Sequence, residues 1–119
     1  MSELDKIKLR LRNFAAERDW DQFHSPKNLA MALIVEAAEL VEHFQWLTEE
    51  QSQNLPHDKL AGVEQEIADI QIYLIRLADK LGVDMEQAVN AKIKLNEKKY
   101  PAEKVRGSAK KYNECGDGC

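Results

Sequence analysis

The stretch NLAMALIVEAAELV, residues Asn28 to Val41, is a strongly apolar segment that carries two acidic residues, and it is among the most informative parts of this chain. Its only charged residues are Glu36 and Glu39, and a spacing of three places both side chains on one face of an α-helix. With a turn of about 100° per residue, three leucines fall within about 60° of Glu36. These are Leu29, Leu33 and Leu40. The pattern predicts a helix whose acidic pair points with the core residues.

A second stretch, VEQEIADIQIYLIRLADKL from Val63 to Leu81, repeats this arrangement. On a helix, Ile70, Tyr73 and Leu77 lie within about 40° of Glu66, and Asp69 lies at the edge of that apolar stripe. Glu64 and Gln71 fall on the other side. A second acidic pair, Glu66 and Asp69, is therefore predicted to share a face with apolar side chains.

The two acidic pairs together predict a metal site. Burying ionised carboxylates beside leucines costs several kcal/mol per ion, and two facing pairs also repel each other. A divalent cation relieves both penalties, and an all-oxygen ligand set suits Mg²⁺, with Mn²⁺ as a substitute. The alternative is that these acids are the solvated edges of amphipathic helices, as most helical acids are.

Composition restricts the class of protein. The chain has 119 residues and a formal net charge of −4, which predicts one domain and argues against a general nucleic-acid or anionic-membrane binder. It has no apolar run long enough for a membrane span, and its charged first residues are unlike a signal peptide, so we expect a cytoplasmic protein. Cys115 and Cys119, in a glycine-rich end, fit a reducing compartment better than a zinc site.

The order of capping residues and breakers predicts an all-α fold of four to five helices. Ser25 with Pro26 is a helix start, Thr48 with Gln51 resembles a capping box, and Gly82 is a helix stop. The expected long helices are residues 2–18, 25–46, 58–81 and 84–100, with a short one after Thr48. We expect a catalytic domain at 1–101 and a flexible polar tail at 102–119. Apolar residues surround the 58–81 helix, which predicts a dimer or tetramer.

Three segments resemble the MazG-like nucleoside triphosphate pyrophosphohydrolases. They are NLAMALIVEAAELVEHFQW, EQEIADIQIYLIRLADKLGVD and AKIKLNEKKYP, and ERDWDQFHSPKNL is most similar to the dCTP pyrophosphatase branch. The resemblance covers roughly residues 8 to 113. It implies an oligomeric all-α enzyme that uses Mg²⁺ to hydrolyse a nucleoside triphosphate to the monophosphate and pyrophosphate, and the branch favours dCTP or a modified dCTP as the substrate.

The resemblance also implies roles for individual residues. It makes Glu36, Glu39, Glu66 and Asp69 the metal ligands or the groups that activate water beside the metal. It places four further residues around the nucleotide: Trp20, His24, Trp46 and Tyr73. A core role is the alternative for each tryptophan, and a helix-entry turn is the alternative for His24.

The last predicted helix carries Lys92, Asn96 and Tyr100 at intervals of four, hence on one face. Lys92 suits a phosphate and Asn96 a base or sugar edge. The alternative is a solvated helix end whose lysines favour the helix dipole. Two departures from the branch, Leu11 and lysines at 98 and 99, affect base preference more than hydrolysis.

Two other functions compete with a nucleotide hydrolase. A non-catalytic helical interaction module would use the same apolar faces only to build an oligomer, and its acids would tolerate amide substitution. A di-iron carboxylate bundle also takes glutamates from facing helices, but it expects a Glu-x-x-His motif that Glu39 and Glu66 do not begin. Hydrolysis of a nucleoside triphosphate explains the carboxylates and the aromatic residues together.

Overall fold

The computed structural model describes residues 1–109, and every regular element within that range is helical. The all-α prediction is confirmed. The elements are α1 (Glu3–Glu17), the 3₁₀ turn η1 (Asp21–Phe23), α2 (Pro26–Glu42), α3 (Glu49–Ser52), α4 (His57–Leu81), α5 (Met85–Lys99) and α6 (Ala102–Val105). The two cysteines, Cys115 and Cys119, lie outside the described residues.

Capping residues set the helix ends where the sequence predicts them. Ser25 accepts a hydrogen bond from the Asn28 backbone N–H with Pro26 in the first turn, and Thr48 and Gln51 form a reciprocal capping box. Each cap satisfies backbone N–H groups that have no partner inside the helix. Gly82 ends α4 in the left-handed conformation, at φ 68°, which glycine adopts without steric cost.

The end of α2 differs from the prediction. The apolar pattern continues through Phe44 and Trp46, so the sequence predicts a helix to Trp46, but α2 ends at Glu42. After His43 the backbone N–H of Phe44 donates to Val41 and that of Leu47 donates to Phe44, both at 2.9 Å. These contacts between residues three apart form tight turns, which hydrophobic periodicity does not distinguish from a further helical turn.

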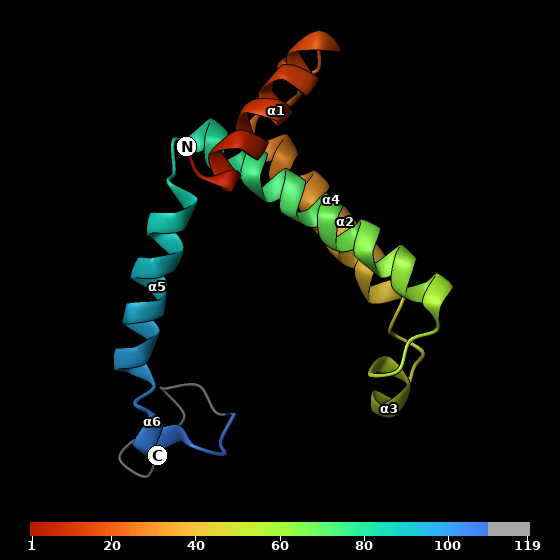
Figure 1. Ribbon diagram of the computed structural model, residues 1–119, viewed down its shortest axis with the longest axis vertical. Helices are drawn as coiled ribbons and strands as arrows, with labels where there is room; N and C mark the ends of the chain where they lie inside the picture. The colour runs from red at the N-terminus through yellow and green to blue at the C-terminus, as the bar shows by residue number, and fades with distance from the viewer. Residues whose placement is uncertain (110–119) are drawn as a thin grey trace. The chain divides into compact units, whose positions relative to one another are not determined.

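The core lies mainly between α2 and α4, which run side by side, with α1 also packed on α4 (Figure 1). Leu29 of α2 is 1% exposed, and Val63 and Ile75 of α4 are also buried. Where the end of α2 lies beside the first turns of α4, Gly62 lets the backbone of α4 approach His43. A Cβ at residue 62 would lie 3.0 Å from Cε1 of that imidazole.

The chain divides into two compact units, Met1–Val83 and Asp84 onward. The first unit contains α1 to α4, and the second contains α5 and α6. The short helix α6 forms within the segment predicted as a tail, where Pro101 occupies its N-cap position. The limits of the catalytic domain, 1–101, and of the tail, 102–119, remain predictions.

Many apolar side chains of α2 and α4 are exposed. They include Met31, Ile34, Val35, Val41, Leu60 and Ile67. No helix within the described residues is long and apolar enough to cross a membrane.

Candidate functional site

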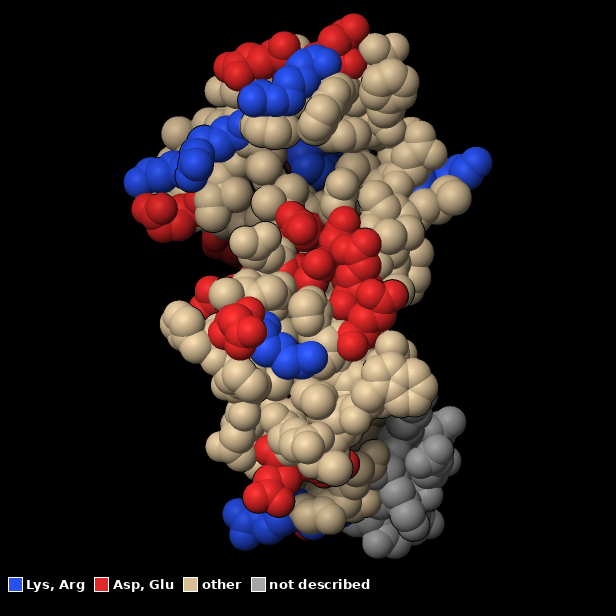
Figure 2. Space-filling model, turned by 90° about the vertical axis from the view of Figure 1, so that its right-hand side faces the viewer, with Lys and Arg blue, Asp and Glu red and all other residues tan. Residues whose placement is uncertain are grey.

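Three of the four predicted metal ligands come together between α2 and α4. Glu36 and Glu39 project from consecutive turns of α2, and Glu66 projects from α4. Each contributes one carboxylate oxygen to a group in which all three atoms lie within 4.8 Å of one another. Asp and Glu side chains also gather on one face of the molecule in Figure 2. The predicted convergence of the two helices at this point is therefore present in the structure.

The pKa values of Glu36 and Glu39, the two carboxyl groups that α2 contributes to this cluster, are raised. The pKa of Glu36 is raised, first by a side-chain hydrogen bond with Glu66 and then by burial. The pKa of Glu39 is raised, first by its side-chain hydrogen bond with Glu36 and then by the charge of that residue. Close carboxylates disfavour ionisation because like charges repel. A cation between them would reverse this effect.

A buried carboxylate oxygen of Glu66 is a second indication of a metal site. Its Oε2 atom is buried and has no hydrogen-bond partner among the described residues. A buried acceptor without a partner costs free energy, and its presence in a native fold calls for an explanation such as a bound ion. Three carboxylates with an unpaired oxygen match the hard oxygen ligands that Mg²⁺ and Mn²⁺ prefer.

Asp69 lies beside this group of three rather than within it. Its charge contributes to the raised pKa of Glu36. The pKa of Tyr73 is also raised, mainly by burial and then by the charges of Glu36 and Asp69. Tyr73 thus remains a neutral phenol next to the carboxylates, with its hydroxyl able to donate or accept a hydrogen bond.

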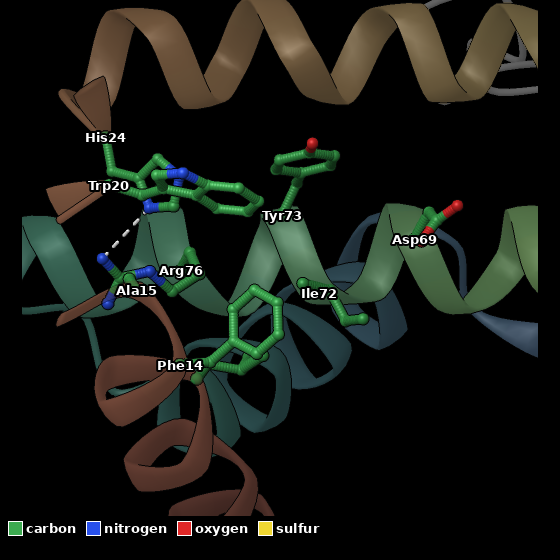
Figure 3. Close-up of a pocket in the computed structure, with 9 residues that line it drawn as sticks. Phe14, Ala15, Trp20, His24, Asp69, Ile72, Tyr73 and Arg76 are labelled. Carbon is green, nitrogen blue, oxygen red and sulfur yellow. Dashed lines mark hydrogen bonds between the residues drawn. The ribbon is translucent and has the colours of Figure 1, made fainter. Parts of the chain in front are cut away.

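Asp69 also lines a neighbouring pocket of about 360 Å³. Its walls come from α1, from the η1 segment and from α4, all within the first unit. Trp20, His24 and Tyr73, three of the four residues that the resemblance places around the nucleotide, line this space (Figure 3), and their contact with a nucleotide stays a prediction. The other lining residues are Leu11, Phe14, Ala15, Ile72 and Arg76. The pocket has mostly apolar and aromatic walls and a few polar groups, which is typical of a site for a small organic ligand.

Aromatic packing orders one wall of the pocket. The rings of Phe14 and Trp20 meet edge to face, with centroids 5.7 Å apart and an angle of 71° between the planes. The guanidinium of Arg18 lies over the ring of Phe14, 3.7 Å from its centroid. Such contacts restrict the orientation of Trp20. Trp20 is 46% exposed, which leaves surface available for stacking against a base.

Sequence reasoning missed Arg76, the buried cation of this pocket. Arg76 is only 4% exposed, and its Nη2 donates to Oδ1 of Asp21 at 3.0 Å. An arginine within an apolar helix usually indicates a solvent-exposed side chain, and the partner that allows its burial comes from a distant segment. The one available signal was spacing, because Arg76 follows Tyr73 by three residues and Asp69 by seven, on the same face of α4.

The contact between Arg76 and His24 fixes the imidazole tautomer. Nη2 of Arg76 lies 3.3 Å from Nδ1 of His24. A guanidinium only donates, so Nδ1 is the acceptor and the proton of the neutral ring resides on Nε2. The pKa of His24 is lowered, first by burial and then by the positive charge of Arg76. His24 is therefore a neutral hydrogen-bond donor at pH 7.

The remaining predicted substrate contacts belong to other parts of the chain. Trp46, in the turns after α2, is 86% exposed and is not among the residues of the pocket. Lys92 and Asn96 lie on α5 and are exposed, and Tyr100 follows at the end of that helix. These three belong to the second unit. Their contacts with substrate remain predictions.

Comparison with known proteins gives the family. The model of the MazG-like family matches residues 31–115. The chain belongs to the MazG-like family. It is 44% identical over 117 residues to dCTP pyrophosphatase 1 of Mus musculus and 42% identical to dCTP pyrophosphatase 1 of Homo sapiens. Each match covers 97% of this chain and 69% of the relative.

A solved structure with a similar fold supports the assignment to the MazG-like family. The crystal structure of a pyrophosphatase from Archaeoglobus fulgidus is 37% identical to this chain and superposes with a TM-score of 0.80. The match covers 85% of this chain and 94% of that one. The resemblance noted from the sequence is confirmed.

Proposed function

We propose that this MazG-like protein hydrolyses dCTP, or a modified dCTP, to the monophosphate and pyrophosphate with the help of Mg²⁺. The observation that carries the proposal is the position of Asp69, which lies beside the carboxylate cluster and also lines the aromatic pocket. One continuous site thus offers ligands for a metal and a space for a base. That combination is what hydrolysis of a nucleotide requires.

The wider reaction class follows from the comparisons. Relatives that match nearly the whole chain are named dCTP pyrophosphatase, and the structural neighbour is a pyrophosphatase. The protein is a nucleoside triphosphate pyrophosphohydrolase. The choice of dCTP among nucleotides and of Mg²⁺ among metals belongs to our proposal.

In the proposed mechanism Glu36, Glu39 and Glu66 would hold the metal, and Asp69 would complete the set or orient water beside it. Mg²⁺ held there would supply positive charge against the triphosphate and make water a better nucleophile. A carboxylate that remains free of the metal accepts the proton of the attacking water. Attack at the α-phosphorus releases pyrophosphate and leaves the nucleoside monophosphate.

The pocket residues position the nucleoside half of the substrate. Trp20 and Tyr73 offer ring surfaces on which a base stacks, at about 1–3 kcal/mol for each stacked base. His24 donates from Nε2 to an acceptor on the base or sugar. The proposal assigns a further stacking role to Trp46, phosphate binding to Lys92, and recognition of a polar edge to Asn96 and Tyr100.

The proposal includes a homo-oligomer in the cytoplasm that does not bind nucleic acid. Exposed apolar residues on both α2 and α4 support self-association, because monomers rarely leave such a surface in water. The net charge of −4 opposes binding to a polyanion.

The same exposed apolar surface favours one alternative function, a helical module that only assembles with itself or a partner. In that case the acidic cluster has no ligand. The two functions differ in their response to metal, because a module gains nothing from Mg²⁺ and tolerates amide substitutions in the cluster.

The test measures pyrophosphate release from a panel of deoxynucleoside and ribonucleoside triphosphates, with Mg²⁺ and with a chelator. We compare the wild type with Glu36→Gln and with Glu64→Gln, a matched control because Glu64 is an exposed acid on the other side of α4. We expect release that requires Mg²⁺, is greatest for dCTP, is lost in Glu36→Gln and persists in Glu64→Gln. Equal activity in the two variants would exclude the cluster as the catalytic centre.

A further inference from the structure

The pocket contains a buried guanidinium with incomplete hydrogen bonding. The two N–H groups of Arg76 Nη2 have partners, since that nitrogen donates to Asp21 and lies 3.3 Å from Nδ1 of His24. Nε is buried without any hydrogen-bond partner within residues 1–109. Nη1 is 3.8 Å from Oδ2 of Asp79, which is an ion pair rather than a hydrogen bond. Arg76 therefore retains N–H groups that can donate to something else.

The position of Arg76 is held by charges on two sides. Asp21 approaches from the η1 segment and also accepts a hydrogen bond from Lys80 at 2.6 Å. Asp79, on the same helix as Arg76, is bound by both Nε and Nη2 of Arg12, at 2.7 and 2.6 Å. These pairs connect α1, η1 and α4. They keep the guanidinium at the pocket wall instead of extending it into water.

Arg76 and Asp69 mark opposite ends of the pocket, as Figure 3 shows. They are seven residues apart on α4, a rise of about 10 Å along the helix axis. In the proposed function, Asp69 marks the end where the phosphates and metal lie. A base stacked near Trp20 and Tyr73 then directs its far edge toward the end that contains Arg76.

We propose that Arg76 is a specificity-determining residue that donates a hydrogen bond to an acceptor on the edge of the bound base. This inference rests on the proposed function, because it requires a nucleotide in this pocket. A guanidinium has five donors and no acceptor, so it favours an edge with acceptors and disfavours an edge with N–H groups. Cytosine presents its O2 and N3 acceptors side by side, whereas thymine and uracil place an N–H between two carbonyls. Arg76 thus favours cytosine among the pyrimidines.

The competing explanation is that Arg76 only attaches η1 to α4 through Asp21. A purely structural arginine affects every ligand of the pocket equally. A base-reading arginine affects only ligands that have an acceptor on the base. The experiment therefore compares two ligands on each protein variant.

The two ligands are α,β-methylene dCTP, which resists hydrolysis, and the same compound with a phenyl ring in place of cytosine. Binding is measured by calorimetry in Mg²⁺ for the wild type, Arg76→Met and Arg76→Lys. Arg12→Met is the matched control, since Arg12 belongs to the same ion-pair network but does not line the pocket. The ratio of the two dissociation constants is the readout. A reduced folded fraction changes both constants alike and leaves the ratio unchanged.

We expect Arg76→Met to reduce the preference for the cytosine ligand about 10- to 100-fold, the range for a hydrogen bond to a charged group. Arg12→Met should leave the ratio within about 3-fold of the wild type. If Arg76→Met does not fold, Arg76→Lys, which keeps the charge but loses the planar donor geometry, should still reduce the ratio. An equal loss of both ligands, or an unchanged ratio, overturns the role of Arg76.

The same assay separates this inference from the function on which it rests. Arg76-dependent binding of the cytosine ligand by a protein that hydrolyses no nucleotide would support the inference and contradict the proposed function. Pyrophosphate release from dCTP with an Arg76-independent ratio would do the reverse.

Discussion

Glu36 is expected to destabilise the fold when no metal is bound and to serve as a metal ligand in the proposed function. Its carboxyl lies against Glu66 and Glu39, and its pKa is raised, first by its side-chain hydrogen bond with Glu66 and then by burial. Without metal, Glu36→Gln should stabilise the fold at pH 7, because an amide removes one of several close negative charges. With metal, the wild type should gain stability, by about 2.7 kcal/mol at a metal concentration one hundred times the dissociation constant.

Thermal unfolding with chelator and with Mg²⁺ checks this prediction. The wild-type midpoint should rise with Mg²⁺, and the midpoint of Glu36→Gln should be higher than wild type in chelator and respond much less to the metal. Glu64→Gln, on the other side of α4, should behave like the wild type. Equal Mg²⁺ responses in all three proteins would contradict metal binding by the cluster.

A second residue-scale prediction concerns pH and the pair formed by Arg12 and Asp79. The pKa of Asp79 is lowered, first by its hydrogen bonds with Arg12. A carboxyl with a lowered folded-state pKa binds fewer protons in the folded than in the unfolded state. Its contribution to stability is complete above the ordinary value of 3.8 and is lost as the pH falls through the folded-state pKa.

Urea denaturation of wild type and Arg12→Met at several pH values measures that contribution. The variant should have a lower midpoint at pH 7, and the difference should decrease below about pH 3.8. Adding Arg12→Met to Asp79→Asn should have little further effect. A difference that stays constant into acid would show that Arg12 stabilises the protein by packing and not by charge.

At the scale of elements, the approach of α4 to the end of α2 depends on Gly62. Alanine is the better helix former by about 1 kcal/mol, but a Cβ at residue 62 would lie 3.0 Å from Cε1 of His43. Gly62→Ala should therefore stabilise the protein only when residue 43 has a shorter side chain than histidine. We expect it to stabilise the His43→Ala protein by about 1 kcal/mol more than it stabilises the wild type.

Denaturant midpoints of the two single variants and the double variant complete this cycle. Simple additivity would mean that the imidazole moves away from residue 62 without cost, and that the close approach does not require glycine.

How far the elements follow from sequence depends on whether the deciding contacts are local. The caps at Ser25 and Thr48 and the stop at Gly82 are local, and each was predicted and is present. The sequence also predicts that the acidic pairs of the two apolar helices share one site, and the structure brings Glu36 and Glu66 together. The end of α2 before Trp46 does not follow, because an apolar turn and an apolar helix share the same composition.

The burial of Arg76 shows the other limit. An arginine is buried only where partners compensate its charge, and Asp21, 55 positions away, provides one. That pairing depends on tertiary structure. The spacing of Asp69, Tyr73 and Arg76 places them on one face of α4, but it does not indicate whether that face is exposed to solvent or buried.

At the scale of the whole molecule, the exposed apolar residues of α2 and α4 predict self-association. Ile34 is 65% exposed near the middle of α2. Ile34→Glu should shift the protein toward the monomer, because a charge in an apolar interface is costly to desolvate. Light scattering after size exclusion measures the mass, and Lys27→Glu at the exposed start of α2 is the control. A wild-type protein that is monomeric at all concentrations would contradict the prediction.

In the proposed function, one molecule joins a carboxylate metal site to a pocket for the base of dCTP. The most direct test identifies the products of dCTP incubated with the protein and Mg²⁺, using phosphorus NMR. We predict dCMP and pyrophosphate in equal amounts, with no dCDP and no free phosphate, and no reaction in chelator. Formation of dCDP and phosphate, or an unchanged dCTP signal from folded protein, would contradict the account.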